Sequence, residues 1–247
     1  MDLKALSTVG RCNTFFEEYW QYVLKQNVIR VPEGCPTIGE AMDLVVIFSE
    51  RNECTRANPV KVEVGEGEHV MVGVATGNWG HHMHVSCNNI TIIGKGKGKT
   101  TILGGFYVDG KQNVKMEQLS VTNETGHGLL CKGSETNVDV MECCFNKCRS
   151  YGMIMGDGAT ATATRCDFMA NGESGVVCGG ANTKVRFNDS TMHHNGGDGL
   201  VAGDHAVVDI HGTKTDIHSN KLVGIRSIIR GKVNIHLPSQ HNTTHDN

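Results

Sequence analysis

The sequence lacks three features that mark common classes of protein. Its 247 residues carry a net charge of −3 at pH 7, so no basic surface indicates nucleic-acid binding. No run of 18 apolar residues occurs, which argues against a membrane-spanning helix. The first residues, Met1 to Lys4, do not lead into the apolar segment of a secretory signal. We therefore expect an intracellular protein or, as an alternative, a component of a virus particle.

Aromatic residues are also scarce, at 5% of the chain, and the ten cysteines lack the spacing of a disulfide framework. Most cysteines stand singly in short apolar segments, where cysteine behaves as a small buried hydrophobe. Cys143, Cys144 and Cys148 have loose ligand-like spacing, but alternate residues of a strand face opposite ways. We predict core cysteines in a reducing compartment and no zinc site.

What the sequence has is glycine, at 31 residues, and an internal repeat of about 23 to 24 residues. The repeats begin at Val114, Val138, Ala161, Val185 and Val208, and a last one begins at Val233. Each complete repeat later reaches a glycine that precedes an apolar run, at Gly128, Gly152, Gly175, Gly199 and Gly224. A period in this range predicts a solenoid, with any function spread over a stacked surface.

Three segments upstream carry a family resemblance. Thr37 to Met42 looks like a capping helix with a capping box of Thr37 and Glu40. The segment from Val60 to His69 and the glycine-bounded runs at Ile90 and Thr100 look like the first coils. Together they resemble the right-handed parallel β-helix superfamily, the pectate-lyase-like proteins. The resemblance implies an all-β fold, a right-handed single-stranded parallel β-helix with an N-terminal helical segment.

This resemblance suggests three parts along the chain. Residues 1–30 form an N-terminal helical segment, 31–237 the β-helix with its capping helix at about 38–51, and 238–247 a polar tail that frays. Residues 12–26 show an apolar helical face that must pack on something. The segment from Leu6 to Phe16 resembles the final helix of an F-box, although the Leu-Pro opening of that motif is absent.

Stacked coils place equivalent residues in columns, and most inward columns are apolar. The outward column Leu130, Ile154, Val177 and Val201 is apolar too, so it predicts a contact surface. Either the N-terminal helix covers it or a second subunit does, as in a homotrimer. Another column predicts an asparagine ladder at a turn; it consists of Glu124, Cys148, Asn171, Asn195 and Asn220.

The column before the repeat glycine is chemically mixed: His127, Tyr151, Ser174, Asp198 and Val223. A tyrosine and a histidine on successive coils are candidates for the base and acid of a catalytic site. With Arg149 nearby, His127, Tyr151 and Asp198 are the catalytic candidates. The competing interpretation is structural, because polar residues are common at turns.

The histidines His81, His82 and His84 are the nearest approach to a metal site. We place them in a loop beside Trp79 and predict no bound metal and no cofactor. Calcium would be expected only for a polysaccharide lyase, but the acidic residues are too dispersed for a calcium site.

No catalytic motif of the superfamily is intact in this sequence. The order of acids typical of polygalacturonases and the Asp-Pro-His of epimerases are both missing. We therefore predict a non-catalytic recognition or structural protein, whose stacked surface binds a protein or a glycan or another copy of the chain. The alternative is a carbohydrate-active enzyme, a lyase, hydrolase or epimerase, that acts on an acidic polysaccharide.

Overall fold

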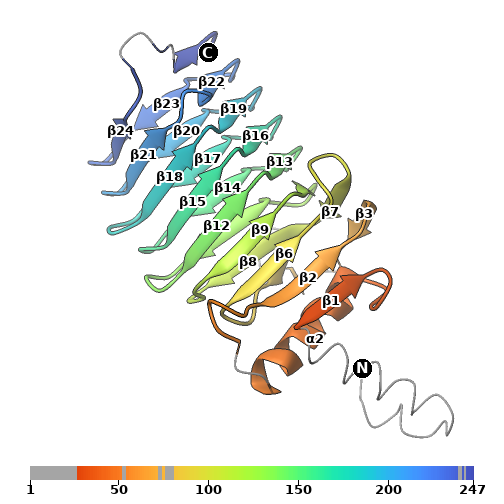
Figure 1. Ribbon diagram of the computed structural model, residues 1–247. Coiled ribbons are helices and arrows are strands. Elements are labelled where there is room, and N and C mark those ends of the chain that lie inside the picture. Colours follow the sequence, from red (N-terminus) through yellow and green to blue (C-terminus); the bar gives the residue numbers. More distant parts are fainter. Residues whose placement is uncertain (1–26, 52–53, 72–73, 76–80, 239–240, 242) are drawn as a thin grey trace, which may run out of the picture.

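The computed structural model describes residues 27–51, 54–71, 74–75, 81–238, 241 and 243–247. The chain winds into a parallel β-helix whose three sheets run the length of the molecule (Figure 1). From β5 to β25, consecutive strands along the chain belong to different sheets, and each strand pairs with its equivalents in the neighbouring coils. All pairs are parallel except β4 with β5. The predicted all-β solenoid is confirmed.

The first sheet has nine strands: β1 (Val28–Val31), β2 (Val60–Val64), β6 (Ile90–Ile93), β9 (Val114–Glu117), β12 (Asn137–Met141), β15 (Thr160–Thr164), β18 (Lys184–Asn188), β21 (Val207–His211) and β24 (Lys232–Ile235). The second has eight: β3 (Gly67–Val70), β7 (Thr100–Leu103), β10 (Ser120–Thr122), β13 (Cys144–Asn146), β16 (Asp167–Met169), β19 (Thr191–His193), β22 (Asp216–His218) and β25 (Thr244–His245). The third also has eight: β4 (Val74–Ala75), β5 (His81–His84), β8 (Gly105–Asp109), β11 (Leu129–Lys132), β14 (Met153–Met155), β17 (Val176–Cys178), β20 (Leu200–Ala202) and β23 (Ile225–Ser227). We call them sheets A, B and C.

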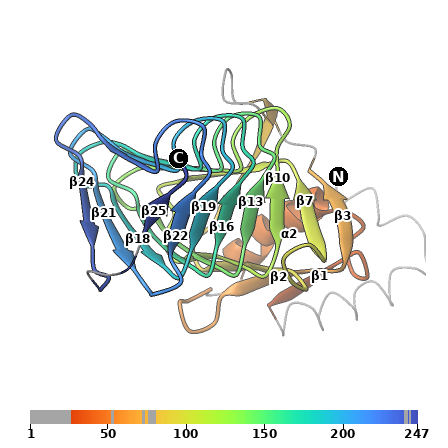
Figure 2. The ribbon, with the colours of Figure 1, turned by 90° about the horizontal axis from the view of Figure 1, so that it is seen from above.

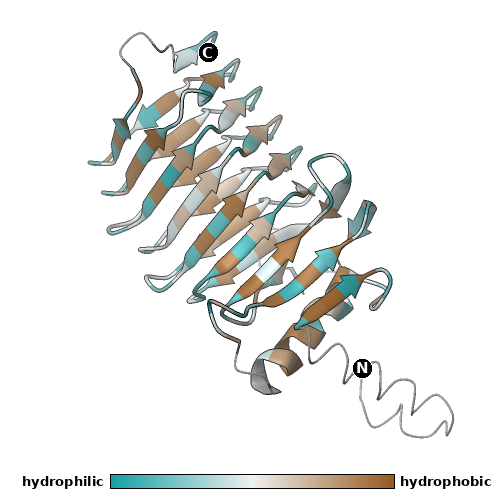
Figure 3. Cartoon of the chain, viewed as in Figure 1, coloured by the Kyte–Doolittle hydropathy of each residue, from teal (hydrophilic) through white to brown (hydrophobic). Residues whose placement is uncertain are grey.

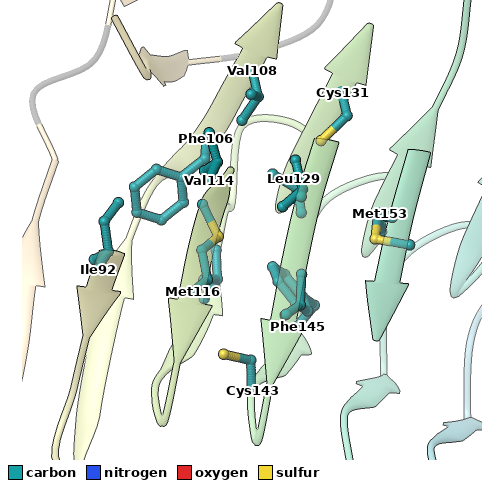
Figure 4. Close-up of a cluster of buried hydrophobic side chains, with 14 of the residues drawn as sticks. Ile92, Phe106, Val108, Val114, Met116, Leu129, Cys131, Cys143, Phe145 and Met153 are labelled. Atoms are coloured by element: carbon teal, nitrogen blue, oxygen red, sulfur yellow. The ribbon is translucent and has the colours of Figure 1, made fainter. Parts of the chain in front are cut away.

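The repeat explains this register, because its apolar columns form the core. Val114, Val138 and Ala161 are Cα partners across β9, β12 and β15, and all three are buried. Phe145 and Phe168 stack at 5.4 Å between centroids in the same interior. Apolar residues therefore alternate along the strands and fill the centre (Figures 3 and 4).

Most of the described cysteines belong to this core, as predicted. Cys131 and Cys178 are fully buried in sheet C, and burial raises the pKa of both thiols. Cys143 and Cys166 occupy one inward column, and burial raises the pKa of Cys166 to about 12. These thiols stay protonated at neutral pH and are poor nucleophiles and poor metal ligands.

A single helix closes the N-terminal end of the core. α2 (Ile38–Arg51) begins where the backbone N–H of Glu40 donates to Thr37 Oγ1 at 3.2 Å, as the capping box predicts. Its apolar face, including Val45 and Phe48, is buried against β1 and β2. Figure 2 shows α2 at one end of the stack of coils.

The boundaries differ from the sequence prediction at both ends. β1 begins at Val28 and pairs with β2, so the β-helix starts before residue 31. At the other end, Thr244 and His245 form β25 beside β22, whereas we expected this tail to fray. The predicted helix 12–26 and the F-box-like segment lie outside the described residues.

Candidate functional site

Two columns of residues run side by side along the corner between sheets B and C. The first is the asparagine ladder, which we define as Asn171, Asn195, Asn220 and Asn247. The amide Nδ2 of each donates to Oδ1 of the next, at 3.0, 2.9 and 2.8 Å along the series. Each Nδ2 also donates to a backbone carbonyl, for example that of Phe168 from Asn195. The chain turns at this corner and cannot form strand hydrogen bonds, so the ladder amides bond to the backbone groups instead.

The repeat glycine leaves room for this ladder and for the backbone of the next coil. A Cβ on Gly175 would lie 2.8 Å from the carbonyl oxygen of Gly199, and one on Gly199 would lie 2.6 Å from that of Gly224. A Cβ on Gly175 would lie 2.8 Å from Asn195 Nδ2, and one on Gly199 would lie 2.9 Å from Asn220 Nδ2. Both distances are too short for two heavy atoms that are not hydrogen-bonded. Only glycine leaves room for both the amide and the carbonyl of the next coil.

The sequence prediction for this column was wrong at its first member. Arg149 N donates to the carbonyl of Asn123, as Gly172 N does to that of Cys148 one coil later. Asn123 therefore occupies the ladder position, and Glu124 is exposed beside it. Cys148 stands in the same column and interrupts the ladder, since its thiol cannot bridge to Asn171 as an amide does.

The second column, which we call the mixed column, consists of His127, Tyr151, Ser174 and Asp198. His127 is buried, and its ring stacks on that of Tyr151 with centroids 5.3 Å apart. The backbone N–H of Tyr151 donates to His127 Nδ1 at 3.4 Å. On the other side, the ring of His82 lies 5.9 Å from that of His127. His82, His127 and Tyr151 thus form a row of three rings, in which the coil of Gly105 lies between His82 and His127.

The environment keeps His127 neutral and Tyr151 protonated. Burial, with a smaller effect of His82, lowers the pKa of His127 to about 4. Burial and a hydrogen bond to Glu173 raise the pKa of Tyr151 to about 12. A general base or acid works best with a pKa near the operating pH, and both shifts move away from neutrality. The ring row is therefore suited to packing rather than to proton transfer at neutral pH.

Ser174 and Asp198, the two C-terminal members of the mixed column, make hydrogen bonds within the protein. Ser174 Oγ accepts from Asp198 N at 3.1 Å. The carboxylate of Asp198, with 7% of its side chain exposed, makes a two-pronged ion pair with Arg226 at 2.7 and 3.0 Å. It also accepts from Val223 N at 3.1 Å. Asp198 is thus fully engaged with the next coil.

The remaining candidates do not join this column. The Arg149 side chain is exposed, and among the described residues it makes no ion pair. Glu173 was not among the predicted site residues, and His82 was predicted beside His81 and His84 in a loop, not beside His127. Glu173 lies at the coil position next to Ser174, and only the register between coils brings it to Tyr151.

The three histidines near residue 82 form a strand, not the loop that we predicted. They lie in β5, where His82 is buried while His81 and His84 are exposed. The ring of His84 instead makes an edge contact with Tyr107 at 4.6 Å. In the described part of the chain, no group of three or more His, Cys, Asp or Glu residues is arranged to hold a metal ion.

The predicted apolar stripe lies along the outer face of sheet C. Leu130, Ile154, Val177 and Val201 are successive Cα partners in β11, β14, β17 and β20. Ile154, Val177 and Val201 are half-buried, whereas Leu130 is only 2% exposed and is already covered. Tyr107 and His84 continue this row toward the N-terminal end, which the sequence analysis did not anticipate.

A hollow of about 990 Å³ lies elsewhere, at the C-terminal end of the solenoid. It is lined by the last strands and turns, including Leu222, Ile225, Val233 and Ile235. It therefore opens along the helix axis and not over the mixed column.

Residues 80–243 match the family model described as the right-handed beta helix region. The chain belongs to the right-handed β-helix family. A sequence search of curated proteins finds no match. The predicted handedness and superfamily are thereby confirmed.

The chain is also similar to several solved structures. The A-module of mannuronan C-5 epimerase AlgE4 from Azotobacter vinelandii is 16% identical with a TM-score of 0.50, over 80% of this chain and 70% of that one. ORF18 of Geobacillus virus E2 is 10% identical with a TM-score of 0.44, over 94% of this chain and 63% of that one. The catalytic domain of a GH87 alpha-1,3-glucanase is 8% identical with a TM-score of 0.37, over 89% and 68%.

The described residues contain no helix that is long and apolar enough to cross a membrane.

Proposed function

We propose that this protein is a non-catalytic β-helix that recognises a partner through the outer face of sheet C. The observation that carries the proposal is the apolar stripe, in which Ile154, Val177 and Val201 stack on consecutive coils. Three half-buried aliphatic side chains in register form a continuous apolar surface on sheet C. Binding of a partner to that surface would remove further apolar area from water.

The chemistry of the stripe favours a protein partner over a glycan. Its centre is aliphatic and offers no hydrogen-bond donors or acceptors at the side chains, which a sugar chain requires. The flanking groups are Tyr107 at one end and Arg226 at the other, and both are enriched in protein interfaces. Arg226 is already paired with Asp198, so its orientation is fixed before binding.

The mixed column supports the same proposal because its groups are committed to the fold. Asp198 is paired, His127 is buried, and the pKa values of His127 and Tyr151 lie far from neutrality. A catalytic role would need at least one of them free to exchange a proton with a bound substrate.

A turnover screen tests the non-catalytic part of the proposal. The protein is incubated with pectate, alginate and related polyuronates, with and without Ca²⁺, and unsaturated products, reducing ends and C5 inversion are measured. We expect no turnover. Turnover that Tyr151→Phe abolishes and Thr191→Ser leaves intact would replace the proposal by the alternative, an enzyme acting on acidic polysaccharides.

A second experiment tests the recognition surface. A photo-crosslinking amino acid is placed at Val177, in the stripe, or at Thr162, on the outer face of sheet A. Crosslinks to one defined protein from position 177, lost on Ile154→Lys and absent from position 162, are the expected result. Equal labelling from both positions would contradict the assignment of the stripe as the binding face.

A further inference from the structure

Two adjacent histidines meet on the outer side of sheet B, at its corner with sheet C. His193 is the last residue of β19, and His194 follows it. Their Nδ1 atoms lie 2.8 Å apart, and the rings are inclined at 82° with centroids 5.0 Å apart. We call these two residues the histidine pair. Strand alternation alone would direct them to opposite faces, so their convergence needs a cause.

The cause is the backbone conformation at this corner. His194 has a φ of 56°, in the left-handed region, and the equivalent corner residues Lys147, Ala170 and Ser219 have φ between 51° and 53°. A left-handed residue directly after a strand ends the alternation, so the side chain of His194 turns toward that of His193. Among the described coils, only this one has two adjacent histidines at the corner.

The neighbouring coils hold the histidine pair in place. The backbone N–H of Ala170 donates to the carbonyl of His193 at 3.2 Å. The His193 ring lies within 5° of parallel to that of His218, with centroids 4.9 Å apart, and His218 stacks in turn on His245 at 5.0 Å. The strands β19, β22 and β25 that carry these rings run side by side (Figure 2). The orientation of His193 is therefore fixed before any ligand binds, while His194 is exposed to solvent.

The contact between the two Nδ1 atoms has room for one hydrogen only. A neutral imidazole has one protonated and one bare ring nitrogen, so one Nδ1 of the pair donates and the other accepts. When that hydrogen shifts to Nε2 of the same ring, both Nδ1 atoms direct lone pairs toward the same place. A metal ion can then take the position of the shared hydrogen, since neutral imidazole is a common metal ligand.

The separation of the two nitrogens indicates the kind of ion. Two nitrogens at about 2.0 Å from a metal ion lie about 2.8 Å apart when the angle at the metal is about 90°, and about 3.3 Å apart when the angle is tetrahedral. The observed 2.8 Å fits the right angle. Right angles are characteristic of Cu²⁺ and Ni²⁺ with nitrogen and oxygen ligands, and Cu²⁺ binds such ligands most tightly among the divalent first-row ions.

The charges around the histidine pair favour a cation. Asp167 and Asp216 lie on β16 and β22, on either side of β19. Lys97 pairs with the first at 2.9 Å and His245 with the second at 3.0 Å, and Asp246 contacts His245 at 2.9 Å. Even when His245 is protonated, these three carboxylates outnumber the two positive groups, so the region does not repel a divalent ion.

A second pair of histidines provides a contrast. His211 and His236 stack on successive coils of sheet A, with centroids 4.2 Å apart and planes within 5° of parallel. The lone pair of an imidazole nitrogen lies in the ring plane, so two stacked parallel rings cannot both direct a nitrogen to one ion. His236 Nε2 also contacts Asp209 Oδ1 at 3.2 Å. This pair is therefore not expected to chelate, although it consists of the same two side chains.

We propose that the histidine pair binds a Cu²⁺ ion through its two Nδ1 atoms, with water molecules in the remaining positions. The site has two protein ligands, which agrees with the lack of any metal-binding group of three or more residues in the described chain. It lies on sheet B and not on the apolar stripe of sheet C, so the inference goes beyond the proposed function and does not depend on it.

The test is a titration of the protein with Cu²⁺ in a buffer that does not bind metals, followed by calorimetry and electron paramagnetic resonance. We expect one equivalent to bind more tightly than any other, with hyperfine coupling to two nitrogens. His193→Asn and His194→Asn should each weaken this equivalent about 10-fold or more, because a chelate becomes a single ligand. Asparagine tolerates the left-handed backbone of position 194, and Asn146 occupies the position equivalent to 193, so both variants are expected to fold.

His211→Asn is the matched control, since it removes one histidine of the stacked pair on sheet A. It should leave the affinity of the first equivalent unchanged. The lack of a tight first equivalent in the wild type, the same affinity in the wild type and both variants of the histidine pair, or an equal loss in His211→Asn would overturn the proposal. Circular dichroism establishes that each variant is folded.

Discussion

The asparagine ladder and the mixed column occupy the same corner of the same coils, yet one is uniform and the other is not. Asn171, Asn195 and Asn220 make the same hydrogen bonds in each coil. Next to them, Tyr151, Ser174 and Asp198 share no chemistry. The difference follows from what each side chain serves. A ladder amide satisfies backbone groups that recur in every coil, whereas each residue of the mixed column needs only a local partner.

This comparison teaches that uniformity along a solenoid marks a structural requirement. Each member of the ladder is a side chain that donates and accepts at once, with a glycine beside it. The mixed column accepts a ring, a hydroxyl or a carboxylate, provided that a neighbouring coil completes its bonding. Four substitutions test this view, in order of decreasing effect.

Removal of one ladder amide should have the largest effect. Asn195→Ala deprives the Phe168 carbonyl, the Asn171 amide and Asn220 Oδ1 of a buried partner. We expect a loss of about 3 kcal/mol in the free energy of unfolding, measured by urea denaturation. Asn137→Ala, at an exposed asparagine whose side-chain amide donates to Thr160 Oγ1, serves as the control and should change stability by no more than about 0.5 kcal/mol. Equal effects would show that the ladder has no special role.

Lowering the pH should reduce the free energy of unfolding because His127 of the mixed column is buried in its neutral form. Its pKa in the folded chain is about 4, below the ordinary value, so the unfolded chain takes up the proton first. The stability that neutral His127 provides is complete above pH about 6.5 and declines as the pH falls toward 4, by about 3 kcal/mol in total.

The variant His127→Asn isolates this effect, because its amide oxygen can still accept from Tyr151 N. Unfolding of both proteins is measured at several pH values between 7 and 4. The wild type should lose more stability than the variant over that range. Parallel curves would mean that His127 is protonated without penalty, which contradicts its burial.

Neutralising the acid of the mixed column should have a moderate effect. Asp198→Asn keeps the size of the side chain but removes the charge that pairs with Arg226. We expect a loss of about 2 kcal/mol in the free energy of unfolding, because the Asp198 carboxylate is largely buried. Glu142→Gln, which changes the exposed pair with Arg165, should give a smaller loss. A larger loss for Glu142→Gln would reverse this order.

Completing the ladder should have the smallest effect, and it should be stabilising. Cys148→Asn places an amide between Asn123 and Asn171, where Asn171 Oδ1 already accepts from the backbone N–H of residue 148. A gain of about 1 kcal/mol in the free energy of unfolding is expected. Cys144→Ala, at a buried thiol outside the ladder, should not stabilise. Destabilisation by Cys148→Asn would indicate that the gap is required by the packing against Gly128.

The core could be predicted almost residue by residue, because strand alternation and the repeat length together fix which side chains face inward. The columns from Val114 to Val233 and from Leu129 to Ile225 are paired as counted. Counting failed where a coil has an extra residue. Five positions separate Asn123 from Gly128, but four separate Asn171 from Gly175, so the count backward from glycine reached Glu124.

The site was less predictable, since it depends on contacts between coils and not on position within one. Glu173 reaches Tyr151, and His82 reaches His127, across coil boundaries that the spacing alone does not align. The burial of Leu130 could not be seen either, because its outward position is the same as that of Val177. Alternation gives the face of a side chain but not what covers that face.

The sequence by itself determined the solenoid, its period, its core and the capping helix, because these follow from local periodicity and capping chemistry that every coil repeats. Only the tertiary structure decided how the corners work. Stacking aligned the ladder amides with the glycines and buried His127 between two rings. These properties depend on the side chains that the neighbouring coils contribute, which the spacing within one coil does not specify.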